Sequence, residues 1–321
     1  MFALTARLAL SAAALRARRL SIVLFHRVVT TPDALLRHEP DIARFAEQMR
    51  WLSASFHILP LRSAVARLRD GTLPARALCI TFDDGYRDNA LNALPVLQSM
   101  GLPATFFVTT RYMDGGMMWN DRVVEAVRHW PGSIMDLGSL GLGSHPLDAG
   151  RAAVMEALLP QIKYQPHAER EALADELLAR SGAPSSRLMM DSDEIRGLHR
   201  AGMEIGGHTV SHPILCALDP AAAAAEIRTN KAVLEDIIAE PLLSFAYPNG
   251  QPHRDYDARH IGILRDCGYT CALSTSPGTA DRHTSPYQLP RFTPWDRQEP
   301  KYLARMLLNY FAQPSCVDEA A

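Results

Sequence analysis

The chain has few cysteines and no pattern among them. Its five cysteines are an odd number scattered through 321 residues. They therefore do not form the framework of paired cysteines that holds small secreted domains together, and this usage favours a reducing compartment. Cys267 and Cys271 lie four residues apart, and we interpret them as small core residues and not as metal ligands.

An excess of charge of one sign is also missing. The 33 Lys and Arg residues nearly balance the 35 Asp and Glu residues, which leaves a formal net charge of -2. This balance indicates neither the basic surface of a nucleic-acid-binding protein nor the charge run of an acidic tail. The chain shows no internal repeat and no long low-complexity segment.

Long apolar runs are absent as well. The uninterrupted stretch 8–15 is too short to span a bilayer, and no cationic segment precedes it, so it does not have the pattern of a signal peptide. We expect residues 1–20 to form a peripheral helix that covers one end of the domain. The alternative is an amphipathic helix on a membrane surface. We therefore expect the protein to be cytoplasmic or peripheral to the membrane.

Seven short, continuous apolar runs are separated mostly by helical patterns. They cover residues 21–25, 77–82, 104–109, 203–207, 242–246, 269–274 and 288–292. Continuous runs are typical of parallel strands that are buried on both faces. Helical patterns lie at 41–53, 192–200 and 220–238. The repeated strand and helix predict an α/β fold, a distorted (β/α)7 TIM-like barrel, with an open doubly wound sheet as the alternative.

One stretch does not fit a single strand and helix unit. Residues 119–187 contain three helical patterns and a glycine-rich link at 131–150 that we expect to be a loop. We interpret this stretch as an insertion over one end of a barrel domain that spans residues 21–313. Residues 314–321 are expected to be a flexible tail.

Two adjacent carboxylates and a pair of histidines suggest chemistry. Asp83 and Asp84 follow an apolar run, and His208 and His212 lie four residues apart. A carboxylate and two imidazoles form a common ligand set for a divalent metal with open positions, and the second carboxylate is then free to act as a base. Taken alone, the carboxylates fit a turn and helix cap, and the histidines fit a structural loop.

Other polar residues follow other predicted strands. His26 ends the first strand, residues 247–250 follow another, and Arg291 lies in the last. In a barrel, the carboxyl ends of the strands form one face, where active sites are built. We therefore expect these distant residues to converge on the carboxylates and histidines.

Three motifs carry a resemblance to a known family. TFDDG (81–85), HTVSH (208–212) and FAYPNG (245–250), in this order, resemble the polysaccharide deacetylase family, also called the NodB-homology or carbohydrate esterase 4 family. The resemblance covers roughly residues 20–295 and implies the NodB-homology barrel. VLFHRV (23–28) and the FAYP form of the third motif are more similar to the branch that acts on the exopolysaccharide poly-N-acetylglucosamine than to the chitin deacetylases.

The resemblance implies roles for individual residues. Asp83 would be the catalytic base, and Asp84, His208 and His212 would bind a divalent metal, usually Zn²⁺ with Co²⁺ or Ni²⁺ as substitutes. The backbone N–H of Asn249 would stabilise the oxyanion. Tyr247, Pro248 and Trp119 are candidates for substrate contact, and Trp119 and Trp295 are candidates for stacking on sugar rings.

The chain departs from the family pattern in two places. Many members carry Arg in the third motif, where this chain has Ala246, and Arg291 is our candidate to orient the base instead. Many members also carry a Leu-x-His motif whose His is the general acid, and that motif is absent from the last strand region. His26 and His283 are the candidate acids, and we favour His26 because it ends a strand.

The resemblance and the residues together predict a metal-dependent hydrolase. It would remove N-acetyl groups from N-acetylhexosamine residues of a glycan, either a polysaccharide or a lipid-linked precursor, and release acetate. The expected partner is therefore an N-acetylated glycan and not a nucleic acid, and the sequence indicates no oligomeric state. The alternatives are hydrolysis of another C–N amide, hydrolysis of an O-acetyl ester, and an inactive glycan-binding barrel.

Overall fold

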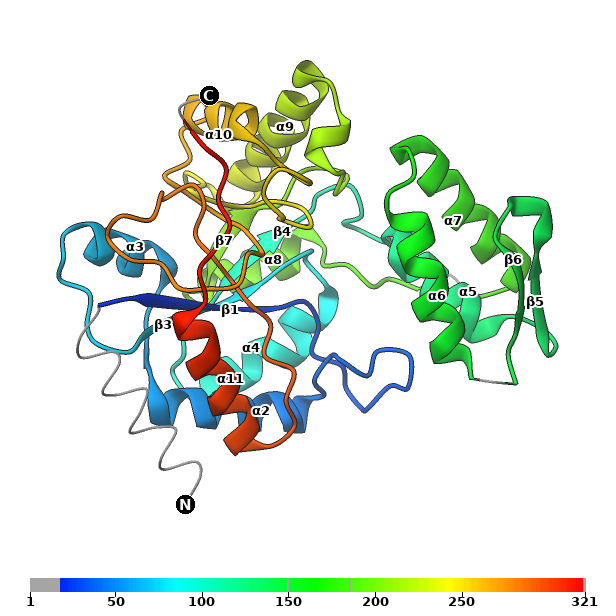
Figure 1. Cartoon of the computed structure of the whole chain (residues 1–321), viewed down its shortest axis with the longest axis horizontal. Helices are drawn as coiled ribbons and strands as arrows, with labels where there is room; N and C mark the ends of the chain where they lie inside the picture. The colour runs from blue at the N-terminus through cyan, green and yellow to red at the C-terminus, as the bar shows by residue number, and fades with distance from the viewer. Residues whose placement is uncertain (1–17, 149, 185, 320–321) are drawn as a thin grey trace.

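The computed structural model describes residues 18–319 except 149 and 185. The helix expected over residues 1–20 therefore lies almost entirely outside the described residues. Within them, helices surround a central sheet, and a second lobe lies beside it (Figure 1). None of the described helices is long and apolar enough to cross a membrane.

The centre of the fold is a curled parallel sheet of seven strands. In spatial order it contains β1 (Leu20–Phe25), β3 (Ala77–Phe82), β4 (Thr105–Val108), β7 (Glu204–Gly207), β8 (Ser244–Ala246) and β9 (Cys271–Leu273), and β2 (His57–Ile58) pairs with the start of β3. β1 and β3 are buried along their whole length, as the continuous apolar runs predict. The predicted (β/α) barrel is confirmed, in the form of a half-barrel.

The predicted strand over residues 288–292 is not a strand. Leu289 makes an isolated bridge to Leu273 in β9, and Phe292 makes another to Val23 in β1. Pro290 lies between them and has no N–H, so a continuous ladder cannot form there. The seventh strand of the sheet is instead β2, a pair of residues too short to be found from an apolar run. The segment nevertheless joins β9 to β1, and it carries Arg291 into the interior, where Arg291 is fully buried.

Helices pack around the sheet. The predicted helices correspond to α2 (Ile42–Ser55), α8 (Ser192–Arg200) and α9 (Pro220–Ile238), which Asp41, Asp191 and Asp219 cap. The sequence analysis missed α3 (Leu61–Arg69), the π-helix Asn89–Ala93 with α4 (Leu94–Ser99), the 3₁₀ turn Leu215–Ala217, α10 (Ala258–Asp266) and α11 (Glu299–Phe311). Four stacked or edge-on rings, those of Phe25, Phe45, Phe82 and Phe106, join α2 to the sheet.

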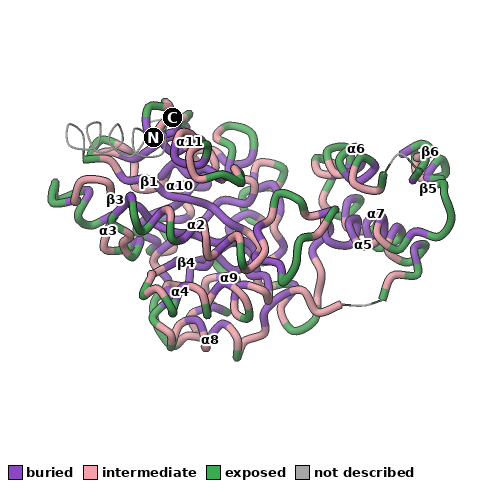
Figure 2. The backbone as a smooth tube through the Cα atoms, turned by 90° about the horizontal axis from the view of Figure 1, so that it is seen from below, coloured by how far each residue is buried: buried purple, intermediate pink, exposed green. Residues whose placement is uncertain are grey.

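The predicted insertion forms the second lobe. It contains α5 (Trp119–His129), α6 (Arg151–Lys163) and α7 (His167–Ser181), and these helices share a hydrophobic core separate from that of the barrel. Figure 2 shows α5 and α7 beside each other with buried residues along them. The expected loop at 131–150 is instead an antiparallel hairpin of β5 (Ile134–Leu137) and β6 (Gly143–Pro146), joined through a 3₁₀ turn at Gly138–Leu140.

The last described residues lie against the barrel and do not extend freely into solvent. The side chain of Gln288 accepts a hydrogen bond from the N–H of Val317 at 2.6 Å and donates one to its carbonyl at 2.9 Å. The N–H of Ser315 donates to Ser276 Oγ at 2.7 Å. Ser315 and Val317 are therefore attached to the barrel by hydrogen bonds, within the segment for which the sequence predicts a flexible tail. All five cysteines are unpaired, and Cys271 is buried in the core.

Candidate active site

The predicted site residues follow β1, β3, β7 and β8 at their carboxyl ends. They open into a cavity of about 640 Å³ that the barrel and the second lobe line together. From the barrel the cavity is lined by His26, Asp83, Asp84, His208, His212 and Asn249, and from the lobe by Trp119, Asp121, Met155, Leu159 and Lys163, among others. Residues as far apart in sequence as 26 and 249 thus face the same space.

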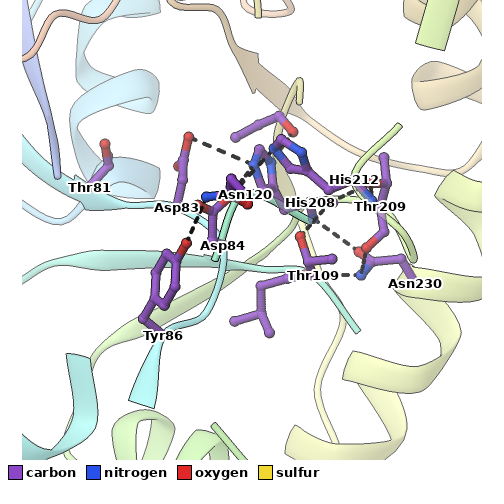
Figure 3. Close-up of polar contacts among 12 residues, drawn as sticks. Thr81, Asp83, Asp84, Tyr86, Thr109, Asn120, His208, Thr209, His212 and Asn230 are labelled. Atoms are coloured by element: carbon purple, nitrogen blue, oxygen red, sulfur yellow. Dashed lines mark hydrogen bonds and ion pairs between the residues drawn. The ribbon is translucent and has the colours of Figure 1, made fainter. Parts of the chain in front are cut away.

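Asp84, His208 and His212 line this cavity, and their side chains lie beside one another (Figure 3). Asp84 Oδ1 lies 3.4 Å from His208 Nε2 and 3.5 Å from His212 Nε2. The three ligand atoms, one from each residue, all lie within 4.8 Å of one another. Asp84 Oδ1 is buried and has no hydrogen-bond partner among the described residues. A buried carboxylate oxygen without a partner is costly, and a cation bound between the three side chains would satisfy it.

The histidine rings are prepared for metal binding. His208 Nδ1 lies 2.7 Å from the carbonyl oxygen of Ala246, which accepts a hydrogen bond from Nδ1–H. In the neutral ring the lone pair of His208 is therefore on Nε2, the atom that faces Asp84. Burial lowers the pKa of His212 to about 3, so this imidazole is neutral at physiological pH. Burial acts to lower the pKa of His208, but the neighbouring Asp83 and Asp84 carboxylates outweigh it and raise that pKa, so a bound cation would take the place of a proton on this ring. Two imidazoles and a carboxylate are the donor set that Zn²⁺ and similar ions prefer.

The loop that carries the histidines has a strained backbone. Thr209 and His212 have positive φ angles of 64° and 52°, a conformation that costs free energy for residues other than glycine. Asn230, which is fully buried in α9, fixes the start of this loop. Its Oδ1 accepts from the N–H of His208 at 3.1 Å, and its Nδ2 donates to the carbonyl of Thr209 at 2.6 Å and to that of Val108 at 2.9 Å.

A second polar residue of α9 holds the rest of the loop. Glu226 Oε2 accepts from the N–H groups of Val210 and Ser211, both at 2.8 Å. Asn230 and Glu226 lie four residues apart and therefore face the same side of the helix. Sequence reasoning missed both. No local signal separates them from the other polar residues of α9, such as Arg228 and Thr229.

The other carboxylate of the pair, Asp83, is held by Arg291. Arg291 donates from Nη1 and Nη2 to the two carboxylate oxygens at 2.7 and 2.8 Å. Its Nε donates to the carbonyl of Ser274 at 3.1 Å, which fixes the orientation of the guanidinium. Burial acts to raise the pKa of Asp83, but the charge and hydrogen bonds of Arg291, together with the charge of His208, outweigh it and hold the pKa below its ordinary value. Asp83 is therefore ionised. Asp83 Oδ2 also lies 3.9 Å from His208 Nε2.

His26 precedes the carboxylate pair in the sequence and Asn249 follows it, and both residues line the same cavity. Asn249 has a φ of 59°, and its N–H has no hydrogen-bond acceptor among the described residues. An N–H without a partner at a cavity wall is available to a bound molecule. The ring of His26 is likewise without a hydrogen-bond partner in the described part of the chain, while its carbonyl accepts from Asn89.

Not all predicted residues reach the cavity. Tyr247 is fully buried, stacks on Tyr256 at 3.8 Å and donates to the carbonyl of Tyr287, so its position does not fit substrate contact. Pro248 is also buried and does not line the cavity. His283 is exposed and lines a different hollow, which removes it as a candidate acid. Trp295 lies beside a neighbouring hollow.

The second lobe adds one acid that the sequence analysis did not find. Asp121 in α5 is buried at the cavity wall and accepts a hydrogen bond from the hydroxyl of Tyr86 at 3.2 Å. Its Oδ2 has no partner among the described residues. Burial raises the pKa of Asp121 to about 7, and the Arg27 guanidinium, 4.0 Å away, only partly offsets this.

Fold and site together place the chain among the (β/α)-barrel proteins with a candidate metal centre at the carboxyl ends of the strands. The sequence profile of the polysaccharide deacetylase family matches residues 70–272, well over half of the chain. The chain therefore belongs to the polysaccharide deacetylase family, as its motifs predict.

Individual relatives are distant. YxkH of Bacillus subtilis (strain 168), whose name assigns it provisionally to the polysaccharide deacetylases, is 20% identical over 249 residues. That alignment covers 77% of this chain and 62% of YxkH, so the chain spans less than two thirds of that relative's length.

Several solved structures share the fold. The Streptococcus pyogenes deacetylase PplD in complex with acetate superposes with a TM-score of 0.61 at 18% identity, covering 90% of this chain and 98% of PplD. IcaB from Ammonifex degensii superposes with a TM-score of 0.57 at 18% identity, covering 89% and 96%. At this identity the likeness establishes the fold, and the chemistry is argued below from this chain's own residues.

Proposed function

We propose that this protein is a metal-dependent hydrolase that removes N-acetyl groups from N-acetylhexosamine residues of a glycan and releases acetate. The observation that carries the proposal is the pairing of two different carboxylate environments at one site. Asp84 faces two imidazoles with an oxygen that has no partner, while Asp83 is bound by a guanidinium and stays ionised. A binding protein would need neither arrangement.

Asp84, His208 and His212 would hold the metal, which we propose to be Zn²⁺, with Co²⁺ or Ni²⁺ as alternatives. A bound divalent ion of this kind lowers the pKa of water and polarises a carbonyl group. The contribution of the protein is to keep the ligand set in place: the carbonyl of Ala246 fixes the tautomer of His208, and Asn230 and Glu226 fix the loop.

Asp83 is proposed to be the general base. It must be unprotonated to accept a proton from water, and Arg291 maintains that state against the effect of burial. Because both carboxylate oxygens are bound by Arg291, the carboxylate plane is also fixed toward the cavity. Arg291 thus acts as a positioning residue for the base.

Two further residues would act on the substrate. The free N–H of Asn249 is a donor for the oxyanion that forms when an acetamide carbonyl is attacked. His26 is the candidate general acid that gives a proton to the departing amine, since it lines the same cavity and its ring nitrogens have no partners among the described residues.

The role assignments make separable predictions. Asp83→Asn should bind metal like the wild-type protein and lose acetate release, because the base is removed while the ligands stay. His208→Ala should lose both metal and activity. Metal is measured by mass spectrometry of the desalted protein, and acetate by an enzyme-coupled assay on N-acetylglucosamine oligomers.

Substrate comparisons then decide between reaction classes. Acetate release from N-acetylglucosamine oligomers is compared with release from O-acetylated sugars and with hydrolysis of a cyclic ureide such as allantoin. Turnover of the N-acetyl substrate only supports the proposal. Turnover of the ester or the ureide in its place would assign the same site to another reaction, and near-normal activity of Asp83→Asn would refute the base assignment.

A further inference from the structure

A second hollow adjoins the candidate active site. It has a volume of about 430 Å³ and lies between the segment that follows β9, residues 291–295, and α11. It shares Leu24, Thr275 and Thr293 with the wall of the catalytic cavity. A molecule bound at the carboxylates and imidazoles can therefore extend into this second hollow, which we call the α11 groove.

Large apolar side chains are unusually exposed at the α11 groove. Trp295 and Leu308 line it and are 53% and 73% exposed, and Phe311, one helical turn after Leu308, is 61% exposed. Pro277, Phe292 and Ala312 complete the apolar lining. Single exposed apolar residues are common on protein surfaces, but a group of them along one hollow marks a binding surface.

Most polar side chains of the groove already have partners within the protein. Asn309 exchanges two hydrogen bonds with the backbone of Gly278, both at 2.9 Å. The hydroxyl of Thr275 donates to the carbonyl of Asn249. The two cations are neutralised as well, because Arg291 is bound to Asp83 and Arg305 to Asp296.

The groove offers few hydrogen-bonding groups to a sugar. Pyranose rings need hydrogen-bond partners for their hydroxyl groups, and among the described groove residues only the hydroxyl of Thr293 and the indole N–H of Trp295 are side-chain polar groups without a hydrogen bond. One face of Trp295 is also covered, since the guanidinium of Arg305 lies 4.0 Å from the centre of its ring. The chemistry of the groove therefore favours an apolar occupant over a further sugar unit.

We infer that the α11 groove binds a hydrocarbon chain that is covalently attached to the N-acetylated glycan, so that the substrate is a lipid-linked glycan. This inference rests on the proposed function, because the glycan must occupy the adjoining cavity. The continuity of the two hollows places the chain next to the sugar, and the exposed apolar residues supply the surface that the hydrocarbon would cover.

The test is a series of N-acetylglucosamine oligomers with methyl, hexyl or decyl aglycones. Burial of each additional methylene is expected to lower KM by about two- to fourfold until the groove is filled, while kcat stays constant. Leu308→Gln should remove this dependence on chain length and leave the kinetics of the methyl glycoside unchanged. Leu308 is exposed, so the variant should fold. The matched control is Leu91→Gln, because Leu91 is 52% exposed and lines neither hollow. It should keep the full dependence.

A binding measurement separates this inference from the proposed function. A decyl glycoside with bromine atoms on the chain should quench tryptophan fluorescence of the wild-type protein, and Trp295→Phe should lose most of that quenching. Quenching without acetate release would refute the proposed reaction and would still support hydrocarbon binding in the α11 groove. Acetate release with equal KM for all aglycones and no quenching would overturn the groove assignment alone. If light scattering showed that Leu308→Gln turns a dimer into a monomer, the groove would be a subunit interface and the inference would be wrong.

Discussion

Replacing Arg291 by methionine is expected to destabilise the protein strongly. Arg291 and Asp83 are both buried, with side chains 0% and 4% exposed, and two hydrogen bonds join them. Methionine fills much of the volume but leaves the Asp83 carboxylate in the interior without its counter-charge. Breaking a buried pair in this way costs about 3–5 kcal/mol, which corresponds to a fall in Tm on the order of 10 °C.

The measurement is thermal and urea unfolding of the metal-free protein, so that no bound ion shields the carboxylate. The double variant Asp83→Asn/Arg291→Met should recover much of the loss, because it removes the unpaired charge together with its partner. Arg180→Met is the matched control. Arg180 forms an ion pair with Glu176 on the surface of α7, with side chains 34% and 48% exposed, and its loss should cost no more than about 1 kcal/mol.

The reasoning would be refuted if Arg291→Met and Arg180→Met unfolded within about 1 kcal/mol of each other. That result would mean that Asp83 reaches solvent and that its ionisation does not depend on Arg291. An unchanged kcat in Arg291→Met would equally contradict the role of Arg291 in positioning the base.

Three other changes test separate parts of the account. Asn230→Ala should weaken zinc affinity about 10- to 100-fold, measured by competition with a chelating dye, because the loop that carries His208 loses its support. Gly206→Ala should destabilise the fold, because the added Cβ would lie 2.4 Å from the Phe107 ring. The control is Gly197→Ala in α8, where the added Cβ meets nothing within 4 Å. This control should raise the free energy of unfolding by about 0.5–1 kcal/mol in the same unfolding assay. Between about pH 4 and 7, Asp121 of the metal-free protein is protonated in the folded state and ionised in the unfolded state. The free energy of unfolding should therefore fall as pH rises through that window, by at most about 1.4 kcal/mol per pH unit. Asp121→Asn should flatten this slope, and an unchanged slope would show that Asp121 titrates normally.

Much of the barrel could be predicted because its strands are short apolar runs buried on both faces. β1 and β3 begin and end within a residue of the predicted ranges, and the capped helices α8 and α9 have the predicted bounds. Residues 288–292 were misread because the apolar run was given more weight than Pro290, which has no N–H and interrupts a ladder. The isolated bridges on either side of Pro290 are decided by the tertiary structure.

The site was predictable where its residues are adjacent in sequence. Asp83 with Asp84 and His208 with His212 were found from local patterns and from the order of the motifs. The side chains that support them come from distant elements, and Asn230 and Glu226 of α9 are invisible until the helix is placed against the loop. Tyr247 was misassigned for the opposite reason: it belongs to a recognisable motif, but its ring points into the core and stacks on Tyr256.

The central claim is that Asp84, His208 and His212 hold a metal on which acetate release depends. The most direct test is to measure the metal content of the purified protein together with acetate release from N-acetylglucosamine oligomers, before chelation, after chelation and after zinc is returned. The account predicts about one divalent ion per chain, loss of acetate release on chelation and its recovery with zinc. Acetate release that survives complete removal of the metal would contradict the account.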